Sequence, residues 1–394
     1  MSKRGFEEIR KLVFEDESLQ HELRDLTDRS AFVTRLTALG AEHEPQLSST
    51  DIEEALRDSR PTDSKFHRNI NPLSAQFRDW VPVRANWNNL RPCVEWCYTG
   101  DQRFTDPFFE DTIRRRIRQP FNLLFRRETS IEFLRDVCEQ STVCAPTGFI
   151  FHMSRCGSTL VAQMLAALPS NIVISEAPPV DSIVSAEVSE IERGRWLKWM
   201  IGALGRTRNA NERNYFLKLD SWNILEFDLI RRTFPDVPCI FLYRNPVEVI
   251  ASHMRQRGLQ MVPGGPVTSI LTDVNLTQAL EMRAEEYSAR ILAKFCASAL
   301  QHAVDENLIL INYNQLPGAV TNEIAEHFGL SFNPKELDQM NEAATLDAKT
   351  PQLFFELDSE RKRTEATDAA RLAAAEWVDP IYERLENMRT RFAK

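Results

Sequence analysis

The chain has 394 residues, of which 43% are hydrophobic and 27% are charged, values typical of a folded globular protein rather than a disordered, collagen-like or coiled-coil chain. Its length predicts two or three domains. It carries 48 Lys and Arg against 57 Asp and Glu, a formal net charge of −9. This charge argues against nucleic acid or an anionic membrane as a partner over the whole surface, and it restricts any anion site to a local pocket.

Three absences narrow the protein class further. No apolar run approaches the roughly 20 residues of a membrane-spanning helix, and the first residues lack the apolar core of a signal peptide, so we expect a cytoplasmic protein without a membrane span. The seven cysteines are scattered apart from Cys93 and Cys97, which predicts free thiols rather than disulfides or a zinc site. The seven histidines show no paired ligand spacing, so we expect no metal site.

The first 140 residues divide into two parts. Residues 1–58 place apolar side chains at helical spacing, which predicts a small helical module. Residues 57–72 carry two prolines and many charges, as linkers do, and residues 59–140 as a whole are expected to form an aromatic-rich linker and helical subdomain. Its density of aromatic residues favours packing against a neighbouring domain over a stacking cleft; among them are Trp80, Trp87, Trp96, Tyr98, Phe104, Phe108, Phe109, Phe121 and Phe125.

From residue 141 to 394 short apolar runs alternate with longer helical patterns, which predicts an α/β domain with a parallel β-sheet flanked by helices. Ligands bind such sheets beyond the carboxyl ends of the strands, so the residues after each strand are the candidates for a site. The expected strands are 148–153, 172–174, 215–219, 239–243 and 308–312, and the expected helices are 159–168, 186–205, 222–233, 246–257, 276–303 and 319–328.

A short polar loop follows the first of these strands. It contains Gly157 in a chain with only 13 glycines and leads into a helix near Thr159, an arrangement whose backbone N–H groups suit an anion. It is not a Walker A loop, because Ser158 stands where that motif has its lysine. An ordinary tight turn between strand and helix remains an equal alternative.

A second candidate follows the strand 239–243. Arg244 ends this strand, Pro246 fits the first turn of the next helix, and Ser252 lies further along it. An arginine with a hydroxyl group at this place can bind a phosphate through charge-assisted hydrogen bonds. The alternative is that Arg244 pairs with a structural carboxylate.

Together these two segments resemble the nucleotide-binding signature of sulfotransferases that use 3′-phosphoadenosine 5′-phosphosulfate (PAPS). The run 154-SRCGST-159 resembles the motif around the 5′-phosphosulfate, with Ser154 in place of proline and Cys156 in place of serine. Arg244-Asn245-Pro246 with Ser252 matches the motif that binds the 3′-phosphate. The resemblance covers residues 145–390 and implies a P-loop sulfotransferase fold with an N-terminal helical extension, PAPS as donor, and adenosine 3′,5′-bisphosphate (PAP) as product.

The resemblance implies roles for further residues. Glu176 falls where protein-tyrosine sulfotransferases and related branches carry a glutamate base, and Lys218 falls where the family places a lysine against the transferring sulfonate. Asp220 replaces the histidine base of the small-molecule branch and would orient or assist. The basic run 361–363 would supply a loop over the 3′-phosphate. The implied catalytic residues are therefore Glu176, Arg155 and Lys218, and the implied nucleotide ligands are Arg155, Cys156, Gly157, Ser158, Thr159, Arg244, Ser252, Tyr313 and Lys362.

The sequence thus predicts an enzyme that transfers a sulfuryl group from PAPS to a hydroxyl or amine of an acceptor, a peptide or a small metabolite, without nucleic acid as a partner. Two alternatives stay open: a non-catalytic nucleotide- or peptide-binding module on the same fold, and a P-loop kinase. Residues 4–58 also resemble the Nif11-type leader domain of some bacterial peptide precursors, through Phe32 and the helix stop at Leu39-Gly40. The acceptor and the oligomeric state have no signature in the sequence.

Overall fold

The computed structural model describes residues 3–42, 47–58, 67–68, 77–88, 91–265, 267–349 and 358–392. The chain forms two compact units, one of residues 1–144 with 177–210 and one of residues 145–176 with 211–394. The division differs from the expected α/β domain at 141–394, because residues 177–210 belong to the first unit. The apolar periodicity of this segment predicts its helices but not the unit against which they pack.

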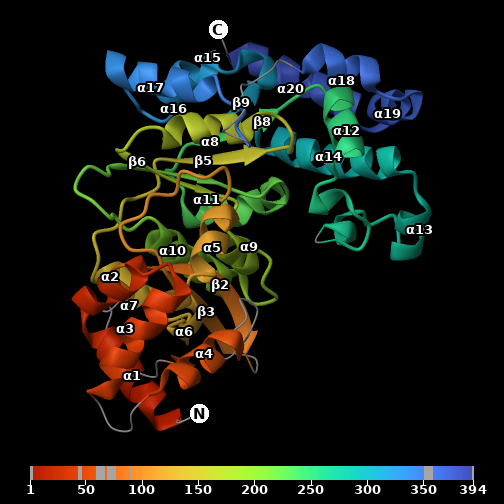
Figure 1. The fold of residues 1–394 in the computed structure, drawn as a ribbon. Helices are drawn as coiled ribbons and strands as arrows, with labels where there is room; N and C mark the ends of the chain where they lie inside the picture. The colour runs from red at the N-terminus through yellow and green to blue at the C-terminus, as the bar shows by residue number, and fades with distance from the viewer. Residues whose placement is uncertain are drawn as a thin grey trace. The chain divides into compact units, whose positions relative to one another are not determined.

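The second unit is built on a five-stranded parallel sheet in the order β6-β7-β5-β8-β9 (Figure 1). The predicted parallel sheet flanked by helices is therefore confirmed. Its strands are almost wholly buried, as the continuous apolar runs require. They are β5 (Gly148–His152), β6 (Asn171–Ser175), β7 (Asn214–Lys218), β8 (Cys239–Tyr243) and β9 (Leu308–Asn312).

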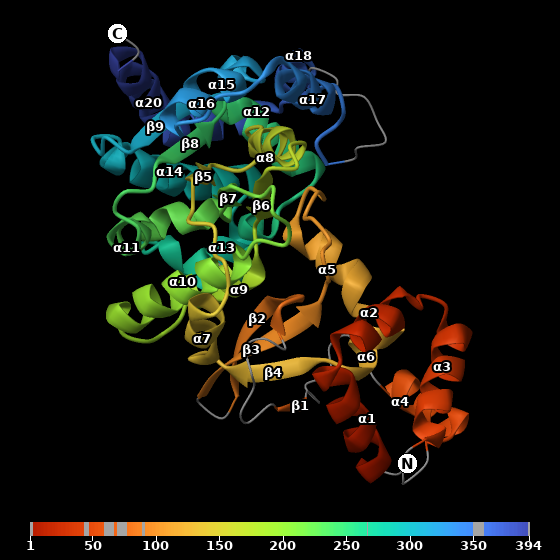
Figure 2. The same ribbon diagram turned by 90° about the vertical axis from the view of Figure 1, so that its left-hand side faces the viewer.

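Helices lie on both faces of this sheet. Helix α8 (Ser158–Ala166) and helix α17 (Pro334–Ala344) pack together on one face, and α11 (Phe227–Thr233) and α14 (Ala284–His302) lie on the other (Figure 2). Helix α12 (Pro246–Arg255) begins directly after β8, with Asn245 as its N-cap and Pro246 in its first turn, the positions these residues prefer. The remaining helices of the unit are α13 (Leu276–Glu281), α15 (Gly318–Thr321), α16 (Glu323–His327), α18 (Ser359–Glu365), α19 (Asp368–Ala373) and α20 (Asp379–Phe392).

The first unit opens with the expected helices, α1 (Lys3–Glu15), α2 (Glu17–Asp25), α3 (Arg29–Ala41) and α4 (Ser49–Asp58). Their likeness to a Nif11-type leader domain stays a prediction. The carboxylates of Asp16 and Asp28 accept hydrogen bonds from the first turns of α2 and α3 and so cap both helices. The later helices of the unit are α5 (Phe109–Ile117), α6 (Pro120–Leu124), α7 (Phe133–Glu139), α9 (Pro178–Val184) and α10 (Glu190–Leu204).

The expected helical subdomain at 59–140 also contains a sheet of four strands, in the order β1-β4-β3-β2. Several of the aromatic residues form the core of this unit itself, whereas packing against a neighbouring domain was expected: Trp80, Trp96 and Tyr98 are at most 1% exposed, although Trp87 is 40% exposed. These three buried residues lie on strands, whose extended backbone accommodates aromatic side chains well. The predicted linker at 57–72 falls largely outside the described residues. The strands are β1 (His67–Arg68), β2 (Trp80–Asn88), β3 (Arg91–Tyr98) and β4 (Arg127–Ser130).

Among the helices of the described ranges, none combines the length and the apolar character that a membrane crossing requires. All seven cysteines, which lie in the described ranges, are present as thiols and not as disulfides. The described residues contain no group of three or more His, Cys, Asp or Glu side chains placed to hold a metal ion.

Candidate functional site

The loop between β5 and α8 has an unusual backbone. Ser154, Arg155 and Gly157 have φ angles of 78°, 52° and 87°, all in the left-handed region that favours glycine. For the two residues with side chains this conformation costs on the order of 1–3 kcal/mol each, and such strain concentrates at functional sites. The loop is therefore held in a conformation that its own residues do not prefer.

Gly157 is the N-cap of α8 and has no side chain that could accept a hydrogen bond from the first turn of this helix. A Cβ atom at Gly157 would lie 2.6 Å from Leu316 Cδ1 and 2.9 Å from Tyr313 Cδ2, so only glycine fits. Cys156 is fully buried and its thiol donates to the carbonyl of Leu242 at 3.1 Å, so only its backbone is available to a ligand. The uncapped helix terminus favours an anion.

A cavity of about 420 Å³ opens beside this loop, formed entirely by the second unit. Among its described lining residues are six cations and two carboxylates. In a chain with a net charge of −9 this is a strong local excess of positive charge, which a multiply charged anion would neutralise. The lining residues are Arg155, Cys156, Gly157, Ser158, Thr159, Leu160, Arg244, Ser252, Arg255, Gln256, Tyr313, Asp347, Ala348, Lys349, Asp358, Arg361 and Lys362.

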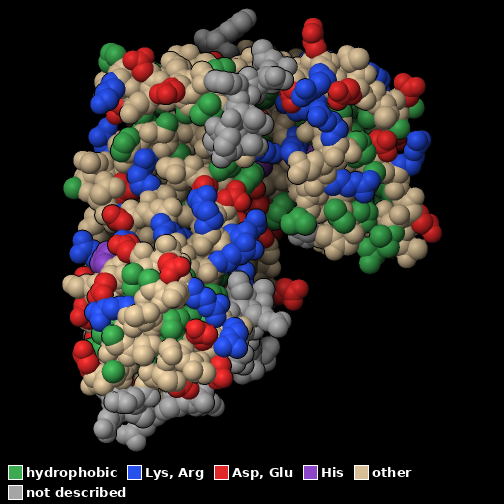
Figure 3. Space-filling model, viewed as in Figure 1, with side chains coloured by type: hydrophobic (Ala, Val, Ile, Leu, Met, Phe, Trp, Pro, Cys, Tyr) green, Lys and Arg blue, Asp and Glu red, His purple; other side chains and the backbone are tan. Residues whose placement is uncertain are grey.

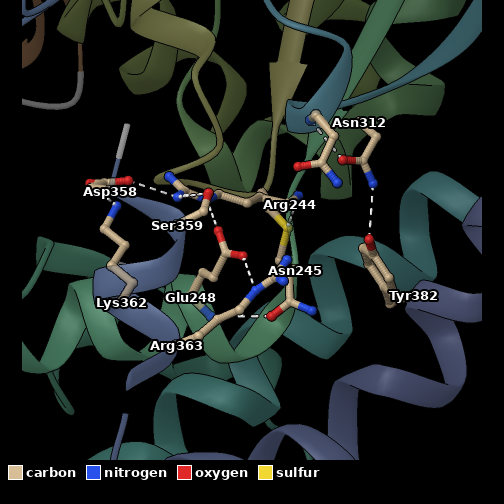
Figure 4. A network of polar contacts seen from close by, with 11 residues as sticks. Arg244, Asn245, Glu248, Asn312, Asp358, Ser359, Lys362, Arg363 and Tyr382 are labelled. Atoms are coloured by element: carbon tan, nitrogen blue, oxygen red, sulfur yellow. Dashed lines mark hydrogen bonds and ion pairs between the residues drawn. The ribbon is translucent and has the colours of Figure 1, made fainter. Parts of the chain in front are cut away.

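Arg244 forms one wall of the cavity and is only 4% exposed. Its Nε donates to Glu248 at 2.6 Å, and its Nη2 donates to Asp358 at 2.8 Å and to Ser359 Oγ at 3.0 Å (Figure 4). The guanidinium carbon lies 3.8 Å from the centre of the Tyr313 ring. Burial opposes the charge, but these carboxylates raise the pKa of Arg244. Arg244 thus has a structural carboxylate partner, Glu248, and also lines the cavity.

Asp358 occupies the space between two cations of the cavity. Its carboxylate accepts a hydrogen bond from Arg244 and forms an ion pair with Lys362, in which Lys362 Nζ lies 2.7 Å from Asp358 Oδ2 (Figure 4). Burial opposes ionisation, but the hydrogen bonds from Lys362 and Arg244 lower the pKa of Asp358. Lys362 lies on helix α18 and not on a loop as expected, and Arg363 in the same helix donates to the buried Glu248 at 2.6 Å. In the basic run 361–363, Arg361 and Lys362 therefore line the cavity, whereas Arg363 holds Glu248.

Glu176 and Lys218 form an ion pair at the carboxyl ends of β6 and β7. Lys218 is fully buried, whereas the side chain of Glu176 is 24% exposed. His152 Nδ1 accepts from the Ser154 N–H at 3.1 Å, so Nε2 of the neutral ring carries the hydrogen. This Nε2 lies 3.0 Å from the Leu219 carbonyl oxygen and 3.3 Å from Glu176 Oε1. Burial opposes ionisation, but Lys218 and His152 hold the pKa of Glu176 well below its usual range. Glu176 is thus an oriented, ionised carboxylate.

Two residues of the expected site have structural partners. Asp220 caps the short helix Ser221–Glu226 through a reciprocal pair of hydrogen bonds with Asn223, which holds its carboxylate in the turn; its role in orienting or assisting stays a prediction. The Tyr313 ring is 8% exposed and covers Gly157 and Arg244. Just before it, the Asn312 side chain donates to Tyr382 Oη at 3.0 Å (Figure 4), which fixes the end of β9.

Sequence reasoning missed several residues of the site. Glu248, the partner of Arg244, could have been found, because it lies one helical turn after Arg244 on α12. Lys349 and Asp358 lie in polar segments with no periodic signal, and only the tertiary structure brings them to the cavity. With Arg255 and Asp347, the described lining therefore adds two cations and two carboxylates to the set that the sequence identified.

The segment after α12 is apolar on its outside. Leu259, Val262, Leu276 and Leu280 are 74%, 41%, 52% and 64% exposed, and Figure 3 shows apolar side chains gathered over the region of α13. Gln260 Nε2 donates to Ser154 Oγ at 2.9 Å, so this segment is anchored to the loop before α8. An apolar surface of the second unit thus begins next to the cavity.

No family model and no curated protein matches the sequence. Solved structures similar in fold include sulfotransferase STF9 from Mycobacterium avium (14% identity, TM-score 0.41, 63% of this chain and 80% of that chain) and the sulfotransferase from Alicyclobacillus acidocaldarius (14%, 0.38, 63% and 97%). Mouse sulfotransferase SULT7A1 complexed with PAP is another (14%, 0.33, 61% and 79%). At such identity the likeness concerns the fold alone, so function has to be inferred from the residues of this chain.

Proposed function

We propose that the protein is a PAPS-dependent sulfotransferase whose donor binds in the cavity of the second unit. The observation that carries this proposal is the cavity itself, about 420 Å³ with six cations against two carboxylates among its described residues. A nucleotide with phosphate groups at both its 3′ and 5′ positions fits two separate cationic ends better than a single phosphate would. PAPS supplies an activated sulfuryl group, and the protein binds it and orients the acceptor.

The cations fall into two groups that suit the two ends of such a nucleotide. Arg155 and the backbone of residues 157–159, at the uncapped start of α8, would hold the 5′-phosphosulfate. Arg244, Ser252 and Lys362 would hold the 3′-phosphate through charge-assisted hydrogen bonds. Tyr313 packs against both Gly157 and Arg244, so it links the two groups.

Glu176 is the group proposed to accept the acceptor's proton. Its carboxylate is ionised, partly exposed and held by Lys218 and His152. In the transfer, the acceptor oxygen or nitrogen forms a bond to sulfur, the bond from sulfur to the bridging phosphate oxygen breaks, and that oxygen keeps the electron pair in PAP. The proton passes to Glu176. Cations and N–H groups at the 5′ end stabilise the charge on the leaving phosphate.

The two alternatives receive less support. A P-loop kinase requires a lysine in the loop, but Ser158 stands there. A non-catalytic module needs no oriented carboxylate, whereas Glu176 is held by two partners in a strained backbone with φ of 53°. For the acceptor, we propose an apolar body that carries a hydroxyl or amine, because exposed leucines lie on the segment anchored to Ser154.

The proposal predicts that the protein binds PAP more tightly than AMP by about 10- to 100-fold, because the 3′-phosphate adds one or two charge-assisted hydrogen bonds of about 1.5–3 kcal/mol. Calorimetric titration with PAP, AMP, ADP and ATP measures this. Equal affinity for PAP and AMP, or a preference for ATP, would contradict the proposal.

A further inference from the structure

We infer that Lys349 is the cation that contacts the 5′-phosphosulfate group of the donor, and that Lys218 instead positions Glu176. The inference rests on the proposed function and assigns a residue that the sequence motifs do not identify. A ligand in the cavity can reach the ammonium group of Lys349, whereas it cannot reach the buried ammonium group of Lys218.

Lys218 is poorly placed to contact a ligand. Its side chain has no exposed surface, and its ammonium forms an ion pair with Glu176. A ligand that took this ammonium away would leave the carboxylate of Glu176 without its strongest partner at the moment when it must accept a proton. Buried charges are costly unless they stay paired. Lys218 therefore stays paired with Glu176 and holds its carboxylate in place.

Lys349 has the opposite properties. It lines the same cavity as Arg155 and the first turn of α8, and among the neighbouring charges Arg155 acts on it most strongly. The residue is exposed, so a ligand can reach it. Its backbone N–H donates to Asp347 Oδ1 at 3.0 Å, which holds the turn after α17. Among the contacts that the described residues make, the Lys349 ammonium has no carboxylate within ion-pair distance.

The charges around Lys349 make it a proton-binding group near neutral pH. Partial loss of water around its ammonium, together with the positive charges of Arg155 and Lys218, lowers the pKa of Lys349 to about 8. Lys362 adds to this effect and Glu176 opposes it. An anion bound beside Lys349 removes the repulsion and raises its pKa again, so the complex takes up a proton above pH 8.

This coupling gives a direct test. At pH 8 the free Lys349 is about half protonated, so PAP binding should be accompanied by uptake of about half a proton, and by little uptake at pH 6.5 to 7. The 5′-phosphate of PAP serves as the probe for the anion at this end. Calorimetric titrations with PAP in two buffers of different ionisation enthalpy, at pH 7 and at pH 8, measure the number of protons.

Three variants assign the uptake to its source. Lys349→Arg keeps the charge at every accessible pH and should bind PAP with no proton uptake at pH 8. Lys349→Met should lose the uptake and weaken PAP binding at pH 7 by about 10-fold, the loss of one charge-assisted hydrogen bond. Lys335→Met, on the exposed surface of α17, removes a lysine away from the cavity and should behave as the unchanged protein does.

Lys362 and His253 are other buried bases at or near the cavity. Burial lowers the pKa of Lys362 as well, although Asp358 opposes this, so only the uptake that Lys349→Arg abolishes is assigned to Lys349. Burial and the charges of Arg155, Lys349 and Lys362 lower the pKa of His253 to about 3, too far below pH 8 for it to supply the uptake. The phosphate groups of PAP are already fully ionised at pH 8 and take up none.

The outcomes separate this inference from the proposed function. PAP binding with proton uptake that Lys349→Arg abolishes supports the inference. Tight PAP binding with no uptake at pH 8, or with the same uptake in Lys349→Arg, would overturn the role of Lys349 and leave the sulfotransferase proposal standing. Failure of the unchanged protein to bind PAP would overturn both.

Discussion

Replacing Glu176 with glutamine is expected to reduce sulfuryl transfer by about 100-fold while PAP still binds with unchanged affinity. General bases contribute about 10²- to 10⁴-fold to rate. The expected loss lies at the lower end, because Lys218 and His152 hold the pKa of Glu176 low and a carboxylate of low pKa is a weak base. Glutamine keeps the size of the side chain and an oxygen that accepts from Lys218, so the site retains its shape.

The measurement is the rate of PAP release from PAPS, with any acceptor that the unchanged protein modifies, alongside calorimetric titration with PAP. Glu187→Gln, at an exposed position of the first unit, is the matched control and should keep full activity. The low pKa also predicts that transfer by the unchanged protein persists at pH 5, since Glu176 stays ionised there. A Glu176→Gln variant with an unchanged rate would remove Glu176 from the mechanism.

Replacing Arg244 with alanine is expected to abolish the preference for PAP over AMP and to destabilise the protein. Arg244 is 4% exposed and its partner Glu248 is 1% exposed, so the variant leaves a buried carboxylate that, among the described residues, keeps Arg363 as its ion-pair partner. Removing one member of a buried ion pair costs about 3 kcal/mol. The loss of the guanidinium should weaken PAP binding by about 100-fold, since hydrogen bonds to charged groups contribute about 1.5–3 kcal/mol each, and should leave AMP binding almost unchanged.

Urea denaturation measures the stability and calorimetry measures the ratio of the two affinities. Arg213→Ala, which removes an exposed ion pair with Glu336, should cost at most about 1 kcal/mol and leave PAP binding intact. If Arg244→Ala does not fold, Ser252→Ala and Lys362→Met test the same end of the cavity and leave the ion pair between Arg244 and Glu248 in place. Equal losses of PAP and AMP binding in these variants would count against a 3′-phosphate site.

The α/β part of the fold could be predicted because its elements carry strong local patterns. All five strands from Gly148 to Asn312 are mostly apolar runs. Such runs, when they alternate with helices, are typical of a buried parallel sheet. Arg155 and Arg244 were identified as candidates for a related reason, because they follow strands whose carboxyl ends lie at one edge of the sheet, whereas Glu176 and Lys218 were named from the resemblance to sulfotransferases.

The remaining features depend on contacts between distant segments. Strands β2 and β3 contain aromatic residues whose spacing in the sequence does not distinguish a strand from a helix. They form strands because the two segments pair with each other in an antiparallel ladder over Trp80–Tyr98. The assignment of residues 177–210 to the first unit depends on tertiary packing alone. Asp358 approaches Arg244 from 114 positions away in the chain, a separation that no local pattern reports.

The crystal structure of the protein with PAP tests the central claim most directly. The account predicts the 3′-phosphate on Arg244, Ser252 and Lys362, with Asp358 no longer hydrogen-bonded to Arg244, because the phosphate replaces its carboxylate as the anion between the two cations. It predicts the 5′-phosphate on the loop before α8, with Lys349 beside it. PAP bound outside this cavity, or bound with its 3′-phosphate at the start of α8, would contradict the account.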